Sequence, residues 1–417
     1  MDRMDREKLE LIAHECGVSA LRVISRTGRS LVLRGSFSLG PHAGKPCMLK
    51  IIKGSHSHLM YQDRLFERVM ACQAIHVGEV PSCDPPARRP HRSGLPQIVR
   101  HAYVAFPDGE ELVYELASWI PGITLDDYLL RAMPRGASTF PLDLRIVSLL
   151  ADVVLGLSQV VAGGVLLHRD IRPSNILVSG LPDVTRDTVP LALPGSVESD
   201  DPLDLRVALI DFDTAWILDR SLSASGDDSA SMPAARSEAA PASMLPIEVR
   251  GASPALGTPG YTAPEGLSDT GADQLNERVD IYSLGVVAHE VLTGRWPYPV
   301  EEAGGMGLAF WREWLRPGAR VGADVARAKP AAAGPFSISE ELPDDVAALI
   351  ASCLDLDPAC RPTALEAAQA FDGFARDHAG ESRRLRRPAF AATGRVGPTP
   401  VSAGAPTEAP AKGRARI

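Results

Sequence analysis

The amino-acid sequence predicts an α+β chain with two lobes, a small β-rich lobe followed by a larger helical one. Two observations support this. Apolar residues alternate with polar ones over 21–52, whereas from residue 146 onward they recur with helical spacing. The chain has 417 residues, of which 45% are hydrophobic and 23% charged, so it is long enough to bury a large core.

The expected elements follow in order along the chain. Apolar alternation broken by turn residues predicts three antiparallel strands within 21–52, which contains LRVIS, SLVLRGSF and KPCMLKII. A helix is expected over about 59–75, followed by a strand pair around 103–116. In the second half of the chain, the stretches 280–292 and 343–354 have the spacing of helices.

One long apolar run, residues 146–167, raises the question of a membrane span. Its length is sufficient, but Asp152, Gln159 and a Gly-Gly pair interrupt it, so a buried helix followed by a strand is expected instead. The N-terminal MDRMDREKLELIAHECG carries charges where a signal peptide needs an apolar core, and the six cysteines include no CxxC pair. These features predict a cytoplasmic protein without a membrane span.

Charge and composition limit the partners and the packed part of the chain. The sequence has 43 basic and 52 acidic side chains and a net charge of -9, which argues against binding to nucleic acid or to an anionic membrane surface. Segments 81–96, 180–204 and 219–256 are rich in Pro, Ser, Ala and Gly without periodicity and are expected as loop insertions. Residues 1–19 are expected to form an N-terminal extension, and 377–417 a disordered basic tail rich in Pro, Ala and Gly.

Two strand-like runs lead to residues that can carry chemistry. The first is followed by His168-Arg169-Asp170 and then by Asn175, and the second, VALIDFDTA, reaches Asp211. Oxygen-bearing side chains at two adjacent strand ends suit a magnesium nucleotide, because Mg²⁺ prefers oxygen ligands and completes its shell with waters and phosphate oxygens. Asp170 is then free to orient a hydroxyl nucleophile and to accept its proton.

Five motifs occur in order over roughly residues 20–375: HRDIRPSN, DFD, GTPGYTAPE, DIYSLGVVAHEVLTGRWPY and DPACRPT. They resemble the catalytic loop, the metal-binding element, the end of the activation segment, the buried helix after it and the late arginine element of protein kinases. The chain therefore resembles the protein kinase superfamily, and more specifically the bacterial Hanks-type Ser/Thr protein kinases.

This resemblance implies an enzyme, a protein-serine/threonine kinase with the bilobal kinase fold. The kinase domain is expected over 20–376, with an N-lobe of about 20–116 and a C-lobe of about 117–376. ATP and Mg²⁺ are the implied cofactors, with Mn²⁺ as an alternative ion, and hydroxyl groups of proteins are the implied substrates.

The resemblance also implies a role for each catalytic residue. Asp170 corresponds to the catalytic base, Asn175 and Asp211 to the magnesium ligands, and Lys50 to the residue that anchors the α- and β-phosphates. Arg172 stands where most Ser/Thr kinases have a lysine and keeps its positive charge. Any one of these residues alone would be read as a cap or a solvated side chain, so their order and spacing carry the assignment.

Further residues are implied around the nucleotide and its lysine. Glu67 is the implied partner of Lys50, with Val69 as the alternative at that position of the predicted helix. Nucleotide contacts are expected from Ile24, Val32, Met48, Lys50, Glu67, Glu115, Leu177 and Asp211.

Other residues are implied to support the site. Glu265 and Arg361 would form a buried ion pair that ties the activation segment to the large lobe. Asp280 would hold the catalytic loop through hydrogen bonds to backbone N–H groups. Thr258 matches the residue that contacts the catalytic Asp in Ser/Thr kinases.

The activation segment, from Asp211 to Glu265, contains SLSASGDDSASMPAARSEAAPAS and leaves two alternatives open. It is either a disordered insertion without function or a switch that is phosphorylated, by the protein itself among others. Arg169 would then receive the phosphate through charge-assisted hydrogen bonds. Asp227 or Asp228 is the acidic alternative to that phosphate.

The chain departs from the family pattern around the phosphates. Ser25, Thr27 and Ser30 stand at the three glycine positions of the phosphate-covering loop, where side chains limit the approach of backbone amides. Met48 stands where the family has an alanine that touches the adenine ring, so the resemblance implies either a narrower adenine pocket or a displaced roof of that pocket. Asp213 replaces the glycine of the DFG element. Asp is among the few other residues that tolerate a left-handed backbone, and its added negative charge would either strengthen metal binding or repel the phosphates.

Three functions remain to be separated. The first is an active Ser/Thr protein kinase, favoured by the complete set of catalytic residues. The second is a pseudokinase that binds nucleotide as a scaffold, suggested by the altered phosphate loop, Met48 and Asp213. The third is a small-molecule phosphotransferase, although such families generally lack the GTPGYTAPE and DPACRPT elements present here.

Overall fold

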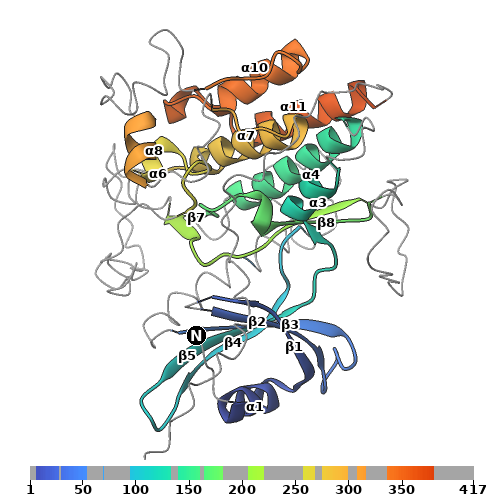
Figure 1. Ribbon diagram of the computed structural model, residues 1–417, viewed down its shortest axis with the longest axis vertical. Coiled ribbons are helices and arrows are strands. Elements are labelled where there is room, and N and C mark those ends of the chain that lie inside the picture. Colours follow the sequence, from blue (N-terminus) through green and yellow to red (C-terminus); the bar gives the residue numbers. More distant parts are fainter. Residues whose placement is uncertain are drawn as a thin grey trace, which may run out of the picture.

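The computed structural model has a small lobe built on one antiparallel sheet and a larger lobe built mainly of helices, which confirms the expected fold class (Figure 1). The residues that the structure describes are 6–27, 30–53, 69, 94–132, 140–159, 164–181, 205–219, 257–267, 275–298, 308–315 and 336–379. The larger parts of the three expected insertions, and the tail beyond residue 379, lie outside these ranges.

The small lobe is a five-stranded sheet in the order β1-β2-β3-β5-β4, antiparallel throughout. Its strands are β1 (Val18–Arg26), β2 (Ser30–Phe37), β3 (Pro46–Lys53), β4 (Ile98–Ala105) and β5 (Glu111–Ser118). The three strands and the later strand pair expected from apolar alternation are thereby confirmed. Of the helix expected over 59–75, the structure describes one residue, Val69, which is helical and buried.

The register of the sheet decides which side chains face the other lobe. Lys50 on β3 pairs with Val32 on β2 and with Glu115 on β5. Directly paired residues lie on the same face of a sheet, so these three side chains share one face. Their neighbours Leu49 and Leu116 lie on the opposite face and are buried in the core of the small lobe.

Helix α1 (Arg6–Cys16) covers that apolar face of the sheet (Figure 1). Ile12 is fully buried in the core of the small lobe, and Tyr114 on β5 donates a hydrogen bond to Glu15 over 3.2 Å. Lys8 forms ion pairs with both Asp108 and Glu110, which adjoin the turn between β4 and β5. The N-terminal segment set apart as an extension in the sequence therefore packs as part of the small lobe.

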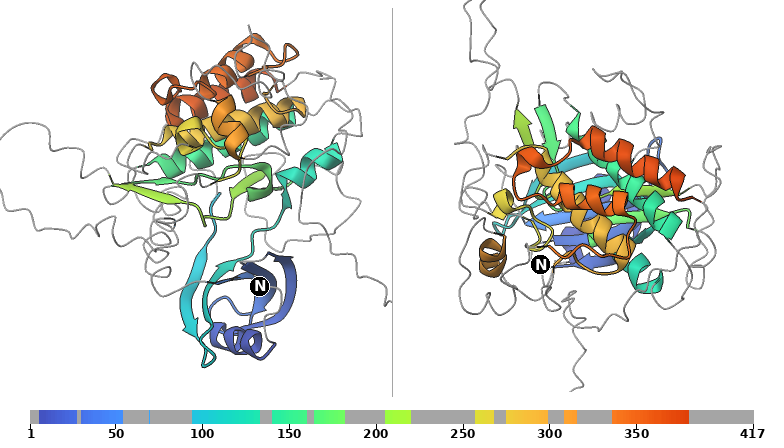
Figure 2. Two further views of the ribbon diagram at one scale, coloured as in Figure 1. Left: turned by 60° about the vertical axis from the view of Figure 1, so that its left-hand side comes forward. Right: turned by 90° about the horizontal axis from the view of Figure 1, so that it is seen from above.

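The large lobe is built around α4 (Phe140–Ser158), which packs against α7 (Arg278–Thr293) and α11 (Ala364–Asp377), while α10 (Asp344–Cys353) packs against α7. Figure 2 shows these helices in the part of the molecule away from the small lobe. Apart from its first residue, every residue of α7 is buried, including the polar Asp280, His289 and Glu290. The helices expected over 280–292 and 343–354 are confirmed.

Short strands line the side of the large lobe that faces the small lobe (Figure 1). One sheet contains β6 (Ile123–Thr124), β8 (Ile176–Ser179) and β9 (Arg206–Leu209), and a second pairs β7 (Gly164–Leu167) with β10 (Trp216–Asp219). The remaining described elements are α3 (Leu125–Ala132), α6 (Pro264–Leu267), α8 (Leu308–Trp314) and the 3₁₀ helices Pro173–Asn175 and Pro358–Cys360.

The apolar run 146–167 forms most of α4 and then β7, so the expectation of a buried helix followed by a strand is confirmed. Asp152, which interrupts the run, is buried within α4. Within the part of the chain that the structure describes, no helix is both long enough and apolar enough to cross a membrane.

The burial of α1 makes a testable prediction about the small lobe. Ile12→Ala removes apolar atoms from a fully buried position and is expected to destabilise the small lobe by about 2–5 kcal/mol. Leu11→Ala is the matched control, because Leu11 is 53% exposed and its truncation should change stability by at most about 0.5 kcal/mol. Hydrogen exchange at the β2 and β3 amides would measure the stability of both variants. Equal losses of protection in Ile12→Ala and Leu11→Ala would contradict the packing role of α1.

Candidate active site

A carboxylate at the start of α7 binds the backbone of the catalytic loop. Asp280 accepts hydrogen bonds from the backbone N–H of His168 over 2.7 Å and of Arg169 over 2.9 Å. Arg169 adopts a left-handed backbone with φ of 68°, a conformation that costs energy in a residue with a side chain. The expected role of Asp280 is thus confirmed, since its two hydrogen bonds hold this strained turn in place.

Asp170 lies at the centre of a small hydrogen-bonded group. Its Oδ1 accepts from the Thr258 hydroxyl over 2.7 Å, and its Oδ2 accepts from Nδ2 of Asn175 over 2.9 Å. The same Nδ2 also donates to the backbone carbonyl of Asp170 over 2.9 Å. The carboxylate is therefore fixed from two directions, and the contact expected of Thr258 is confirmed.

Arg172 adds a positive charge beside this carboxylate. Its Nε lies 3.3 Å from Oδ2 of Asp170, which makes an ion pair without the alignment of a hydrogen bond. The Arg172 side chain is 36% exposed, whereas that of Asp170 is 11% exposed. The guanidinium is thus placed at the open side of the catalytic loop, where an incoming anionic group could meet it.

Lys50 connects the two lobes. Its ammonium lies 2.7 Å from Oδ1 of Asp211 and 2.6 Å from Oδ1 of Asp213, both of which follow β9 in the large lobe. Burial opposes the charge of Lys50, but the surrounding carboxylates outweigh burial and hold its pKa above the ordinary value. Lys50 is therefore a charged ammonium that two carboxylates already engage.

The backbone conformation differs between these two aspartates. Asp211 adopts the left-handed conformation, with φ of 69°, whereas Asp213 does not. The tolerance of aspartate for a left-handed backbone is therefore not needed at Asp213. A glycine is not required at that position for conformational reasons, and a side chain fits there without backbone strain.

Glu115 lies opposite Lys50 on β5 and is buried. Burial raises the pKa of the Glu115 carboxyl to about 7, and the positive charge of Lys50 opposes this shift. Glu115 was expected to contact nucleotide, and the structure places it in the middle of β5, paired with Lys50. A charged residue inside the apolar run ELVYELAS was the available sequence signal for this unusual position.

The remaining residues expected around the nucleotide come from both lobes. Val32 and Met48 are half-buried on β2 and β3, and Met48 pairs with Ala117 on β5. Ile24 on β1 is 50% exposed. Leu177 is half-buried on β8, two residues after Asn175. Glu67 lies outside the described residues, so its expected pairing with Lys50 stays a prediction.

Hydroxyl groups close the turn between β1 and β2, where the family pattern has glycines. The Thr27 and Ser30 hydroxyls lie 2.9 Å apart, and the Ser30 N–H donates to the Thr27 hydroxyl over 2.9 Å. The Thr27 N–H donates to the Ser30 carbonyl over 2.8 Å. Side chains thus bind one another across the turn, so that these two hydroxyls are already hydrogen-bonded within the loop.

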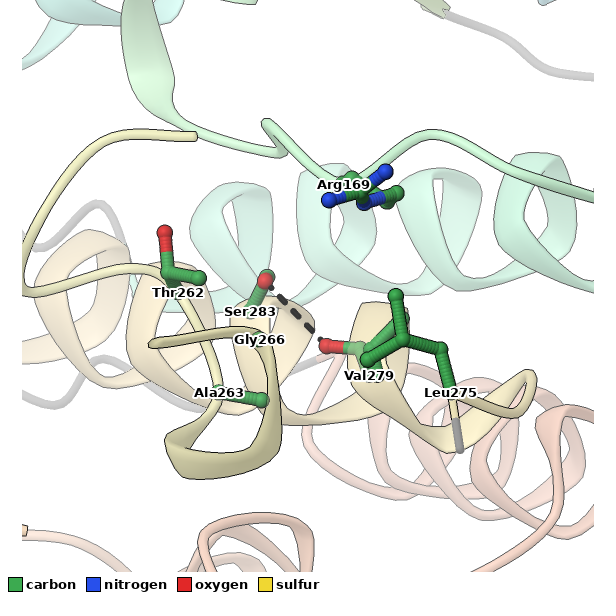
Figure 3. A pocket seen from close by; sticks show the side chains of 7 residues that line it. All are labelled: Arg169, Thr262, Ala263, Gly266, Leu275, Val279 and Ser283. Atoms are coloured by element: carbon green, nitrogen blue, oxygen red, sulfur yellow. Dashed lines mark hydrogen bonds between the residues drawn. The ribbon is translucent and has the colours of Figure 1, made fainter. Parts of the chain in front are cut away.

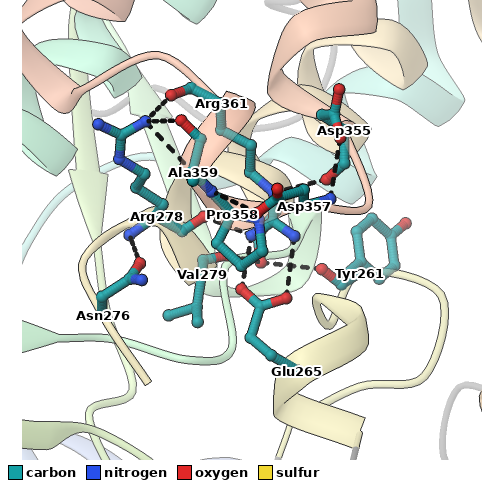
Figure 4. Close-up of polar contacts among 11 residues, drawn as sticks. Tyr261, Glu265, Asn276, Arg278, Val279, Asp355, Asp357, Pro358, Ala359 and Arg361 are labelled. Carbon is teal, nitrogen blue, oxygen red and sulfur yellow. Dashed lines mark hydrogen bonds and ion pairs between the residues drawn. The ribbon is translucent and has the colours of Figure 1, made fainter. Parts of the chain in front are cut away.

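The activation segment is fixed to the large lobe by the expected ion pair (Figure 4). Arg361 donates from Nη1 to Oε1 of Glu265 over 2.5 Å and from Nη2 to Oε2 over 2.9 Å. Arg361 is 1% exposed, and its Nε also donates to the Asp355 carbonyl over 2.7 Å. This bidentate geometry satisfies the buried guanidinium on several sides and confirms the predicted pair.

A small pocket lies where the catalytic loop meets the end of the activation segment and α7 (Figure 3). Arg169 lies on one side, and Thr262 and Ala263 lie across the pocket from it. The Arg169 guanidinium also lies 6.0 Å from the Trp216 ring centroid. Residues 220–256 are outside the described part of the chain, so the expected binding of a phosphate by Arg169, and the roles of Asp227 and Asp228, stay predictions.

Oxygen atoms of Asn175 and Asp211 suit a magnesium ion that is shared with phosphates. Both side-chain hydrogen bonds of Asn175 use Nδ2, which leaves its amide oxygen as a ligand atom, and Asp211 provides a carboxylate. Among the described residues, no group of three or more His, Cys, Asp or Glu side chains forms a closed metal site. Two protein ligands completed by waters and phosphate oxygens are the usual arrangement for Mg²⁺ beside a nucleotide, so these residues fit the ion.

Comparison with known proteins decides the family. Residues 124–371, more than half of the chain, match the protein kinase domain. The chain belongs to the protein kinase family. The match begins at residue 124 and therefore covers the large lobe, which contains the catalytic loop and the ion pair of the activation segment, but leaves out the small lobe with its altered phosphate loop.

Several bacterial kinases are similar to this kinase at low identity. The probable serine/threonine-protein kinase PkwA of Thermomonospora curvata is 24% identical over 368 residues, which is 87% of this chain and 35% of that protein. Serine/threonine-protein kinase pkn3 of Myxococcus xanthus is 28% identical over 226 residues, 54% of this chain and 30% of that protein. Pkn1 of the same organism is 27% identical over 310 residues, 74% of this chain and 33% of that protein. The kinase chain spans about a third of the length of these relatives.

The buried ion pair makes a prediction about stability. Arg361→Met removes the buried guanidinium that binds the Glu265 carboxylate and is expected to destabilise the large lobe by about 3–5 kcal/mol. The matched control is Arg376→Met, since Arg376 is 73% exposed in its pair with Asp372 and should contribute at most about 1 kcal/mol. Urea unfolding would give the free energy of unfolding of both variants. Decreases of similar size would show that burial of the Glu265–Arg361 pair adds nothing to its effect on stability.

The position of Glu115 makes a prediction about pH. The carboxyl has an ordinary pKa of 4.5 but titrates near 7 in the folded protein, so the folded state retains a proton that the unfolded state has lost. Burial of Glu115 therefore lowers the stability of the fold progressively as pH rises from about 4.5 to about 7. Glu115→Gln removes the effect, and its stability relative to wild type should rise by about 2 kcal/mol between pH 5 and pH 8.

Urea unfolding of wild type and Glu115→Gln at the two pH values would measure this difference. Glu341→Gln serves as the control because Glu341 is exposed. If the stability difference between Glu115→Gln and wild type were the same at both pH values, the Glu115 carboxyl would not titrate in this range.

Proposed function

We propose that this chain is an active protein-serine/threonine kinase that transfers the γ-phosphate of ATP to hydroxyl groups of proteins. The observation that carries the proposal is the position of Asp170, whose carboxylate is fixed by Thr258 and Asn175 on a catalytic loop of the protein kinase family. The serine/threonine-protein kinases among the similar proteins support the same substrate class.

In this proposal Asp170 orients the hydroxyl of the substrate and accepts its proton as the hydroxyl oxygen bonds to the γ-phosphorus. The bond between the γ-phosphorus and the bridging oxygen of the β-phosphate breaks, and ADP leaves. Thr258 and Asn175 hold the carboxylate still, so that one of its oxygens can meet the hydroxyl in a defined direction.

Two cationic side chains and two ligand residues complete the site. Lys50 would anchor the α- and β-phosphates, and Arg172 would offset negative charge beside the catalytic loop. Asn175 and Asp211 would hold Mg²⁺, or Mn²⁺, which when bound neutralises charge on the phosphate oxygens. Ile24, Val32, Met48 and Leu177 would surround the rest of the nucleotide.

We also propose that the protein phosphorylates its own activation segment. Arg169 supports this, since it lines a pocket beside the end of that segment and provides the cation that a phosphate would need. Phosphate on a Ser or Thr of the segment 219–256 would be the product.

A nucleotide-binding protein without transfer activity is the second candidate. Two observations favour it: two carboxylates already engage Lys50, and hydroxyls close the β1–β2 turn where the family has glycines. A small-molecule phosphotransferase is less well supported, because the Glu265–Arg361 ion pair belongs to elements that such families generally lack.

Transfer of label from γ-labelled ATP tests the proposal. Wild type with Mg²⁺ or Mn²⁺ should label itself and a generic basic protein on Ser or Thr. Asp170→Asn should lower the rate about a hundredfold or more, because the general base is lost. Asp211→Asn should abolish metal-dependent transfer while the fold, followed by thermal unfolding, stays intact.

Asp127→Asn is the control, because Asp127 is exposed on α3 and takes no part in the hydrogen bonds that hold the Asp170 carboxylate. If wild type bound ATP but labelled nothing, the transfer activity would be refuted and the second candidate supported. Undiminished transfer by Asp211→Asn would instead refute the metal assignment.

A further inference from the structure

The ammonium of Lys50 faces more negative charge than one lysine can neutralise. Asp211 and Asp213 each place an oxygen within 2.7 Å of it, and Glu115 lies opposite Lys50 in the sheet. An ammonium has three N–H donors, and the two aspartates use two of them. The third N–H remains available to a phosphate, which would then share the ammonium with these two carboxylates.

Asp213 is the member of this group that the family pattern does not explain. Asp211 is the proposed metal ligand, whereas Asp213 stands where the resemblance has glycine. The backbone of Asp213 is not left-handed, so its conformation requires neither glycine nor aspartate at this position. The Asp213 side chain is 40% exposed, and its one ion pair among the described residues is with Lys50 over 2.6 Å.

The charges of this group determine what can enter. One ammonium against two ionised carboxylates leaves the group net negative, even when the buried Glu115 keeps its proton. Lys50 is only 9% exposed at its side chain, so water screens these charges less than at the surface. Nucleotide phosphates carry several negative charges and are repelled by such a group, whereas a divalent cation beside the carboxylates offsets their charge.

We propose that Asp213 couples nucleotide binding to a divalent cation, because its carboxylate competes with the phosphates for Lys50 until a cation offsets the negative charge. This inference rests on the proposed nucleotide site, although it does not require that phosphate is transferred. It assigns to Asp213 a role in selecting the metal-bound nucleotide over the free one.

Binding measurements on the full chain test the proposal. Isothermal titration calorimetry would give the Kd of ATP in EDTA and in excess Mg²⁺ for wild type and Asp213→Asn, which keeps the shape of the side chain and removes its charge. In EDTA, Asp213→Asn should bind ATP about tenfold more tightly than wild type, whereas with Mg²⁺ the two should differ by at most about threefold. Adenosine, which has no phosphate, should bind both proteins equally.

Two further variants control this experiment. Asp213→Gly carries the residue of the family motif and should behave as Asp213→Asn does, while Asp127→Asn, exposed on α3, should match wild type. Thermal unfolding of each variant would establish that it is folded.

Equal affinity of wild type and Asp213→Asn for ATP in EDTA would overturn the inference. So would a loss of affinity by Asp213→Asn in Mg²⁺ alone, because Asp213 would then act as a metal ligand. A wild type that bound no ATP in either condition would overturn both this inference and the proposed function. Wild type that bound ATP as expected but transferred no phosphate would refute only the proposed function.

Discussion

The site depends on the hydrogen bonds between Asp280 and the backbone of the catalytic loop. The Asp280 carboxylate is buried, and burial raises its pKa, while the N–H groups of His168 and Arg169 stabilise its charged form. These hydrogen bonds hold Arg169 in a left-handed backbone conformation and so fix the direction in which the Asp170 side chain points. Without Asp280, the backbone of the catalytic loop would be less well fixed, and so would the Asp170 side chain that Thr258 and Asn175 orient.

Contacts within the ordered motifs could be predicted from the sequence. The pair Glu265 and Arg361, 96 residues apart, and the contact between Thr258 and Asp170 both follow from motif order. The strands of the small lobe follow from apolar alternation, and α7 from an apolar run that ends at Gly294, whose left-handed backbone terminates the helix. In each case a local sequence pattern or a motif is sufficient to predict the contact or the element.

The contacts of Lys50 could not be predicted in the same way. Glu115 faces Lys50 because of the register between β3 and β5, and a shift of one residue would turn it to the other face. Asp213 meets Lys50 because the two lobes approach each other, which no local pattern encodes. Helix α1 was assigned to an extension because its charged sequence gives little sign of the single face that Ile12 buries.

The packing of α1 also bears on the order in which the chain can fold during synthesis. Lys8 pairs with Asp108, 100 residues later, so the helix leaves the ribosome well before the β4–β5 hairpin that receives it. At a translation rate of about 5–20 residues per second, this interval is about 5–20 s. During that time β1, β2 and β3 can already meet the apolar side of the helix, whereas the contacts that β4 and β5 supply are still missing.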